Sequence, residues 1–270
     1  MHPDSNRRRR TTATAFAVVF SFVLAACLPP APPAVPPTPP PTDPIRVVVY
    51  GDALTVEMRV LLAGRLAGTS SVLEHAGGGF AVCDVLPSIT TDAANPNVDV
   101  AVLQFTGDTS TPCMSAATTD PARTAAYGAD LADALDTLTA DPGRTVIVLS
   151  SPVRWSASLG VDEPAQLAFN QALADIVTTW QTAHAGSTQA TFIDAAAAVT
   201  TVGAYAWDLP CLPGETVTMG CRFIADTIAV RSPDGRGFCP IAPQLTCPPV
   251  YSPGARRYLD TFADQVLAAL

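Results

Sequence analysis

Three aspartates stand at predicted turns, where their carboxyl groups could do chemistry. Asp52 and Asp108 each follow an apolar run, and Asp234 lies in the Gly-containing stretch SPDGRGF. Clustered carboxylates can bind a divalent cation, or raise the pKa of one member until it serves as a general acid. A structural interpretation competes with this one, because Asp52 is also placed to cap a helix and Asp234 to pair with Arg236. We favour the structural interpretation.

The elements that position these residues alternate between strands and helices. IRVVVYGDAL, from Ile45 to Leu54, predicts a buried strand, a tight turn and the start of a helix. Four more apolar runs predict strands, and four segments predict helices: strands at 71–74, 98–105, 144–149 and 190–193, helices at 54–67, 120–138, 164–185 and 254–270. This alternation indicates an α/β fold with a parallel sheet covered on both faces. The segment 201–252 has little periodicity and predicts loops pinned by disulfides.

The first turn carries a family resemblance. VVVYGDAL resembles the first block of the SGNH (GDSL) hydrolases, in which a serine follows Gly-Asp at the carboxyl end of the first strand. The second block falls among the three glycines 77–79, of which any one could serve it and Gly78 is taken as the candidate, and the third block is Gly107–Asp108. The stretch Asp234–Pro240 is similar to members that read Asp-Gly-x-His-Phe-Cys-Pro. The resemblance covers most of 45–270 and implies a three-layer α/β/α sandwich with a flavodoxin-like five-stranded parallel sheet.

The sequence departs from that family at the positions that carry catalysis. Ala53 replaces the nucleophilic serine and Gly237 replaces the base histidine, leaving Asp234 as the residue that would orient the base. The implied oxyanion-hole positions are Ala53, Gly78 and Asp108, with Asp108 in place of asparagine. An ionised Asp108 would repel a developing oxyanion. We therefore expect a non-hydrolytic SGNH-like domain that has no intact catalytic residue.

Three alternatives remain open for the function. A crevice without a catalyst could bind an acylated glycan, a lipid or an envelope protein, with Asp52 and Arg236 as candidate binding residues. The chain could instead be an active ester hydrolase or acyltransferase that uses Asp52, Asp108 and Asp234. A purely structural interaction role is the third alternative. A relocated triad that uses Ser151 and His75 is the weakest idea, because neither residue sits in an activating motif.

The N-terminal residues predict export and lipidation. An arginine run and an apolar stretch too short to span a bilayer end in Leu-Ala-Ala-Cys, which resembles a bacterial lipobox with Cys27 as the lipidated residue. We expect residues 1–26 to be a lipoprotein signal peptide and 27–44 a lipidated cysteine with a Pro-rich spacer. The SGNH-like domain would then span 45–270. The expected location is the outer face of the cytoplasmic membrane, with the membrane itself as a partner.

Six further cysteines lie in the expected exported domain. An even count there indicates three disulfides, with 15 possible connectivities. We favour three pairs: Cys83–Cys113, Cys211–Cys221 and Cys239–Cys247. No Cys-x-x-Cys pair is present and no histidine lies near a cysteine cluster, so we expect no metal and no cofactor. The net charge of −9 leaves no basic surface for phosphates, so we also expect no nucleic acid partner.

Overall fold

The computed structural model of the chain describes residues 44–108, 111–117, 120–156, 160–161, 163–222, 224–238 and 252–270. The predicted signal peptide, Cys27, the spacer up to residue 43, and the predicted pair Cys239–Cys247 lie outside these ranges. The domain bounds that involve them stay predictions. Within the ranges that the structure describes, no helix is long and apolar enough to cross a membrane.

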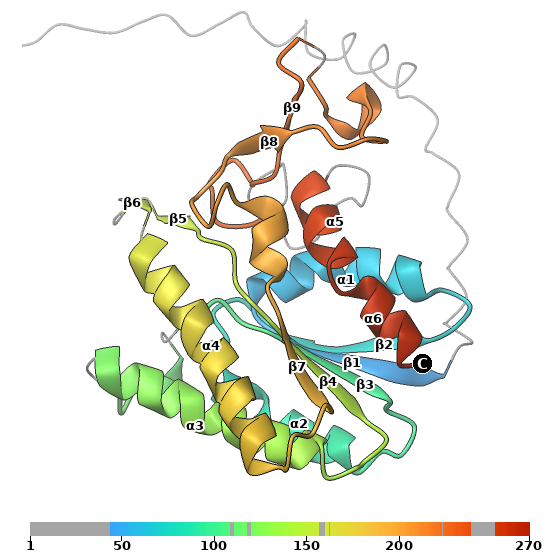
Figure 1. The fold of residues 1–270 in the computed structure, drawn as a ribbon, viewed down its shortest axis with the longest axis vertical. Coiled ribbons are helices and arrows are strands. Elements are labelled where there is room, and N and C mark those ends of the chain that lie inside the picture. Colours follow the sequence, from blue (N-terminus) through green and yellow to red (C-terminus); the bar gives the residue numbers. More distant parts are fainter. Residues whose placement is uncertain are drawn as a thin grey trace, which may run out of the picture. The chain divides into compact units, whose positions relative to one another are not determined.

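A five-stranded parallel sheet forms the centre of the fold. Its strands lie in the order β2-β1-β3-β4-β7 (Figure 1). Their bounds are Ile45–Gly51 for β1, Ser71–Ala76 for β2, Val100–Gln104 for β3, Thr145–Leu149 for β4 and Ala190–Ile193 for β7. The register pairs Gly51 with Gln104 and Gln104 with Leu149, so these strands end level at one edge. The predicted flavodoxin-like sheet is confirmed.

Helices cover both faces of this sheet, as Figure 1 shows. On one face, β-branched side chains such as Val47 and Val49 pack against α1 (Ala53–Leu66), α5 (Pro253–Asp260) and α6 (Ala263–Ala268). On the other face, the alternate residues of the same strands pack against α2 (Val82–Ala93), α3 (Asp120–Leu138) and α4 (Glu163–Ala183). The central strands β1, β3 and β4 are therefore buried on both sides, which explains their continuous apolar sequences, whereas the edge strand β2 is half-buried throughout.

Two helical regions differ from the sequence prediction. The helix α2 was not predicted, because Pro87 and the β-branched run after it argue against a helix; burial of Val82, Val85 and Ile89 outweighs that local preference. The predicted closing helix is broken between α5 and α6. There Thr261 bonds through both its N–H and its hydroxyl to the Tyr258 carbonyl, which tightens the last turn and ends α5.

The segment predicted as loops contains short regular elements. Strands β8 (Asp208–Pro210) and β9 (Thr227–Ala229) pair antiparallel, as do β5 (Trp155–Ser156) and β6 (Gly160–Val161) before α4. Single 3₁₀ turns complete the described elements: η2 at Pro112–Met114, η3 at Ala195–Val199 and η4 at Val217–Met219. Loops and short strands therefore surround the carboxyl edge of the sheet, where sites are built in this kind of fold.

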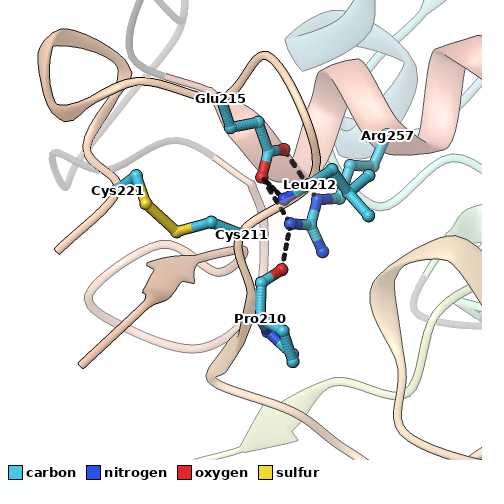
Figure 2. The surroundings of a disulfide bond; sticks show 6 residues. All are labelled: Pro210, Cys211, Leu212, Glu215, Cys221 and Arg257. Atoms are coloured by element: carbon cyan, nitrogen blue, oxygen red, sulfur yellow. Dashed lines mark hydrogen bonds and ion pairs between the residues drawn. A yellow bond between two sulfur atoms is a disulfide. The ribbon is translucent and has the colours of Figure 1, made fainter. Parts of the chain in front are cut away.

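The two predicted disulfides within the described ranges are formed. Cys83–Cys113 joins α2 to the segment after β3, and Cys211–Cys221 closes the loop between β8 and β9. Figure 2 shows how that second loop is held to α5. The Arg257 guanidinium is 7 % exposed and donates two hydrogen bonds to the Glu215 carboxylate, at 2.8 and 2.6 Å, and one to the Pro210 carbonyl.

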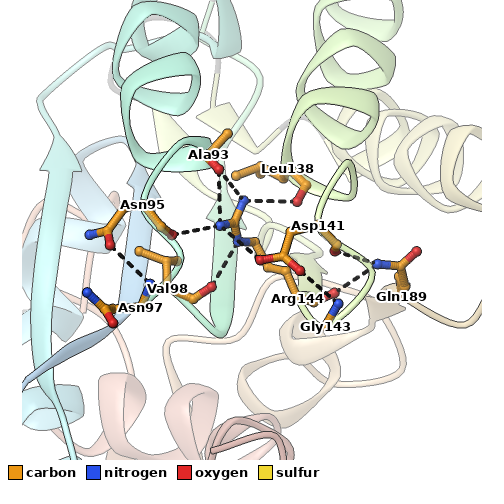
Figure 3. A network of polar contacts seen from close by, with 9 residues as sticks. All are labelled: Ala93, Asn95, Asn97, Val98, Leu138, Asp141, Gly143, Arg144 and Gln189. Atoms are coloured by element: carbon orange, nitrogen blue, oxygen red, sulfur yellow. Dashed lines mark hydrogen bonds and ion pairs between the residues drawn. The ribbon is translucent and has the colours of Figure 1, made fainter.

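At the amino edge of the sheet, a fully buried arginine joins four chain segments (Figure 3). Arg144, 1 % exposed, donates to the backbone carbonyls of Ala93, Asn95, Val98 and Leu138 at 2.9 to 3.3 Å. Ala93 and Leu138 are the last residues of α2 and α3, whose final carbonyls have no partner within the helix. One side chain therefore caps two helices and anchors the starts of β3 and β4.

Candidate functional site

The first turn of the site is held by Asp52 rather than by its neighbour. Asp52 is the N-cap of α1: its Oδ1 accepts the Leu54 N–H at 3.1 Å, and its Oδ2 accepts both the N–H and the hydroxyl of Thr106. Burial raises the pKa of the Asp52 carboxyl, and the Thr106 hydrogen bond and the Arg154 charge oppose that rise. Ala53 is exposed at the first position of the helix and offers only a methyl group.

Because both oxygens of Asp52 are used in this way, its role in the structure is that of a cap and a tie between β1 and β3. Among the described residues, the side chains whose ligating atoms cluster closely enough to hold a metal do not include Asp52, Asp108 or Asp234. Both clusters that qualify contain a disulfide. The structure therefore does not bring the three aspartates close enough together to hold one metal ion.

The second and third blocks meet beside this turn. The Gly77 N–H donates to the Gly51 carbonyl at 3.2 Å, which places the glycine loop against the end of β1. A Cβ placed on Gly79, which has a φ of +79°, would lie 3.6 Å from Asp108 Oδ2, whereas nothing lies within 4 Å of one on Gly78. Gly79, rather than the predicted Gly78, is thus the glycine that faces Asp108.

At Gly237, the predicted base position, a carboxylate from another element fills the space of a side chain. A Cβ on Gly237 would lie 2.1 Å from Glu57 Oε1 and 2.7 Å from Oε2. Glu57 is held there by the Phe238 N–H, which donates to Oε2. Since Glu57 follows Ala53 by four residues on α1, both lie on the same face of that helix. The long side chain of Glu57 therefore fills the space that the absence of a side chain at Gly237 leaves.

The predicted partner of the base, Asp234, serves its own loop. Its Oδ1 accepts the Ser232 hydroxyl and the Arg236 N–H, the latter at 3.1 Å. Burial opposes ionisation of Asp234, but these hydrogen bonds and the Arg236 charge outweigh it and lower the pKa. The Gly237 N–H donates to Ser232 Oγ at 2.9 Å, so the loop is fixed without any histidine. Asp234 and Arg236 are both exposed at the surface of the loop.

Sequence reasoning missed two other groups at this edge. Arg154, half-buried after β4, donates to the Thr106 carbonyl at 3.5 Å. The Tyr127 hydroxyl is buried and has no hydrogen-bond partner among the described residues. Burial raises the pKa of Tyr127 well above its ordinary value, and the charges of Asp52 and Asp108 add to the rise. Neither residue has a local sequence signal. Arg154 comes several residues after the end of β4, and Tyr127 lies within a predicted helix, so nothing in the sequence around them places them at this edge.

The weak alternative of a relocated triad gains nothing from the geometry. The Ser151 hydroxyl is buried and donates to the adjacent Pro152 carbonyl at 3.4 Å. His75 stacks on Tyr50, with ring centroids 5.5 Å apart, and its Nε2 lies 2.9 Å from Asp92 Oδ2. Each of the two residues is thus engaged with its own neighbours.

Comparisons with known proteins agree with this arrangement at the level of the fold. No family model matches the sequence, and no curated protein matches it. A solved structure from Streptococcus pneumonia, provisionally described as a platelet activating factor, aligns over 83 % of this chain and 85 % of its own, with a TM-score of 0.54 and 11 % identity. A protein from Agrobacterium tumefaciens str. C58, provisionally described as an arylesterase, aligns over 83 % of this chain and 99 % of its own, with a TM-score of 0.50 and 13 % identity.

At these identities the likeness establishes the fold and leaves the activity open. Three features of this chain agree with that fold: the order of its parallel strands, the helices on both faces of the sheet, and the turn that places Ala53 at the carboxyl edge. The chain has the three-layer α/β/α fold of the SGNH-type hydrolases.

Proposed function

We propose that this chain is an exported lipoprotein whose SGNH-type domain binds an acylated glycan or lipid without hydrolysing it. The observation that carries the proposal is the exchange at the base position, where the Glu57 carboxylate occupies the space beside Gly237. Ala53 supplies no nucleophile, and Asp108 stands where the family resemblance implies an oxyanion-binding amide. The Glu57 carboxylate is held in place by the Phe238 N–H, so the position of the base is filled by a group with a structural role.

Ester hydrolysis by the full chain, with its disulfides formed, tests the proposal directly. We expect p-nitrophenyl acetate and longer acyl esters to be turned over no faster than the buffer background. Removing a triad member leaves only the residual rate from binding and the oxyanion hole, and here that hole is altered as well. Turnover well above background by the natural chain would reject the non-hydrolytic assignment.

A rebuilt active site tests the residue assignments. The three changes Ala53→Ser, Asp108→Asn and Gly237→His restore the family pattern, but a histidine at 237 would collide with Glu57. We therefore expect esterase activity only when Glu57→Ala accompanies the three changes, and little when Glu57 is kept. If the folded four-fold variant gains no activity, Gly237 does not mark the base position.

The proposed anchor rests on the sequence pattern around Cys27. Acyl chains on that cysteine would hold the domain at the outer face of the cytoplasmic membrane, and the Pro-rich run could extend roughly 50 Å from it. We expect the natural chain to fractionate with membranes and its Cys27→Ser variant to be released from them. Mass spectrometry of the N-terminal peptide gives an independent reading of the lipid.

A further inference from the structure

Three aromatic residues meet next to the loop that carries Asp234: Trp155 in β5, and Tyr205 and Trp207 in the segment just before β8. A Cβ placed on Gly235 would lie 2.7 Å from Trp155 Cβ, 2.8 Å from the Tyr205 hydroxyl oxygen and 3.4 Å from Trp207 Cζ3. The Trp155 N–H also donates to the Gly235 carbonyl at 3.2 Å. Gly235, with a φ of +73°, therefore provides the close backbone approach that brings them together. We call Trp155, Tyr205 and Trp207 the aromatic wall.

The two indoles of the wall face solvent although both are large and apolar. Trp155 is 38 % exposed and Trp207 is 41 % exposed. The rings of Tyr205 and Trp207 are tilted by 59°, with centroids 6.4 Å apart, so they form an angled surface rather than a closed stack. Exposed tryptophans are suited to ligand contact, because a large rigid ring contributes much contact area at little entropic cost.

A buried arginine fixes the wall to the candidate site. Arg231 is 3 % exposed, and its guanidinium lies 5.6 Å from the Tyr205 ring centroid and 5.8 Å from that of Phe238. It also donates to the Val199 carbonyl at 2.8 Å. Since the Phe238 N–H binds Glu57, the wall and the filled base position share one support. The wall is therefore tied to the loop that carries the predicted base position.

Polar groups lie within the same surface. The Tyr205 hydroxyl is buried against Gly235 and has no hydrogen-bond partner among the described residues. The Glu163 carboxylate accepts the Tyr205 N–H at 2.8 Å, which fixes the backbone of that residue. Asp234 and Arg236 flank the wall on the exposed loop. An acyl chain would need an enclosed apolar groove, whereas this surface alternates aromatic rings with hydrogen-bonding groups.

We propose that the aromatic wall is a subsite for the sugar rings of a neutral oligosaccharide. The indoles of Trp155 and Trp207 would stack on the apolar C–H faces of pyranose rings. The Asp234 carboxylate and the Arg236 guanidinium would bind the hydroxyl groups at their edges. This inference rests on the proposed function and specifies its ligand, since it assigns the glycan part of an acylated glycan to this side of the crevice.

Oligosaccharide binding by the full chain tests the subsite. Isothermal titration and intrinsic tryptophan fluorescence would be measured with the hexasaccharides of glucose, xylose, mannose and N-acetylglucosamine. We expect at least one of them to bind, and Trp155→Ala or Trp207→Ala to weaken it by about ten- to a hundredfold, as the loss of one stacked aromatic contact predicts. Trp207→Phe, which keeps a ring, should retain most of the affinity.

Controls separate this inference from folding and from the proposed function. Ile224→Ala removes an exposed apolar side chain in the loop between β8 and β9 and should leave the affinity unchanged. Thermal unfolding identifies a variant that fails to fold, and the alanine variant of the other tryptophan then carries the test. The subsite is rejected if no hexasaccharide binds, if the tryptophan variants bind as well as the natural chain, or if only acyl-chain vesicles of phosphatidylcholine bind. Ester turnover would reject the proposed function and leave the sugar subsite standing.

Discussion

The contact between Gly237 and Glu57 makes a quantitative prediction about stability. Gly237→Ala places a methyl group 2.1 Å from Glu57 Oε1, so the carboxylate must move away and the Phe238 N–H loses its acceptor. A hydrogen bond to a charged group contributes about 1.5–3 kcal/mol, and replacing glycine offsets about 0.4–1 kcal/mol through the unfolded chain. We expect a net loss of about 1–2 kcal/mol.

A double-mutant cycle isolates that contact. Glu57→Ala removes the same hydrogen bond and also the obstacle, so adding Gly237→Ala to it should cost almost nothing. The double variant should therefore lose about 1–2 kcal/mol less stability than the sum of the two single losses, and this difference is the coupling free energy. Urea unfolding of the four proteins measures the coupling free energy. Thermal unfolding gives a second measurement, in which a chain of this size should show a Tm change of about 2–4 °C per kcal/mol.

The control for this cycle is Gly78→Ala. Nothing lies within 4 Å of a Cβ at Gly78, so this change should alter the free energy of unfolding by no more than about 0.5 kcal/mol. Additive losses from Glu57→Ala and Gly237→Ala would show that the two positions do not touch. That result would also remove the main argument for a filled base position.

Three further predictions concern other parts of the fold. Arg144→Met should destabilise the chain by more than about 4 kcal/mol in urea unfolding, because four backbone carbonyls lose their donor together; a loss below about 1 kcal/mol contradicts the network. Replacing Cys211 and Cys221 by serine should cost about 2.7 kcal/mol from loop entropy, for a sequence separation of 10; equal stability under oxidising and reducing conditions would argue against that bond. Burial opposes ionisation of Glu215, but its hydrogen bonds from Arg257 and Leu212 outweigh that effect and lower the pKa of its carboxyl. The ionised Glu215 therefore stabilises the fold fully above the ordinary glutamate pKa, and this stabilisation is lost as pH falls through the lowered pKa. Glu215→Gln should flatten that acid limb of the stability curve, and an unchanged limb would exclude the assignment.

The sheet could be predicted because its central strands β1, β3 and β4 are continuous apolar runs with clear ends. The bounds of β7 and of α3 agree with the sequence prediction, since Gly and Pro lie close to those segments. The helix α2 could not be predicted, because its stability comes from packing against the sheet rather than from helix propensity. Local pattern thus predicts elements whose own sequence carries the apolar spacing of a helix or a strand, and fails where packing against a neighbour supplies the stability.

The candidate site was predictable only in part. Ala53 was located from the strand, turn and helix that bracket it. Glu57 gave no sign of its role, because its partner Phe238 lies 181 residues further along the chain. The same holds for the aromatic wall, which joins Trp155 of β5 to Tyr205 and Trp207 in the distant segment before β8. Contacts between distant loops depend on the finished fold, so residue type and spacing within one segment do not reveal them.

The arginine at the amino edge has a consequence for how such a sequence can evolve. Arg144 connects the ends of two helices with the starts of two strands, on the side of the sheet opposite to the crevice. Substitutions at Ala53, Asp108 or Gly237 touch none of its hydrogen bonds. A lineage could therefore change these residues one at a time without losing the hydrogen bonds that hold the opposite edge of the sheet together. Because the stabilising network lies at the amino edge, the carboxyl edge, where this fold builds its sites, can tolerate substitutions without disturbing that network.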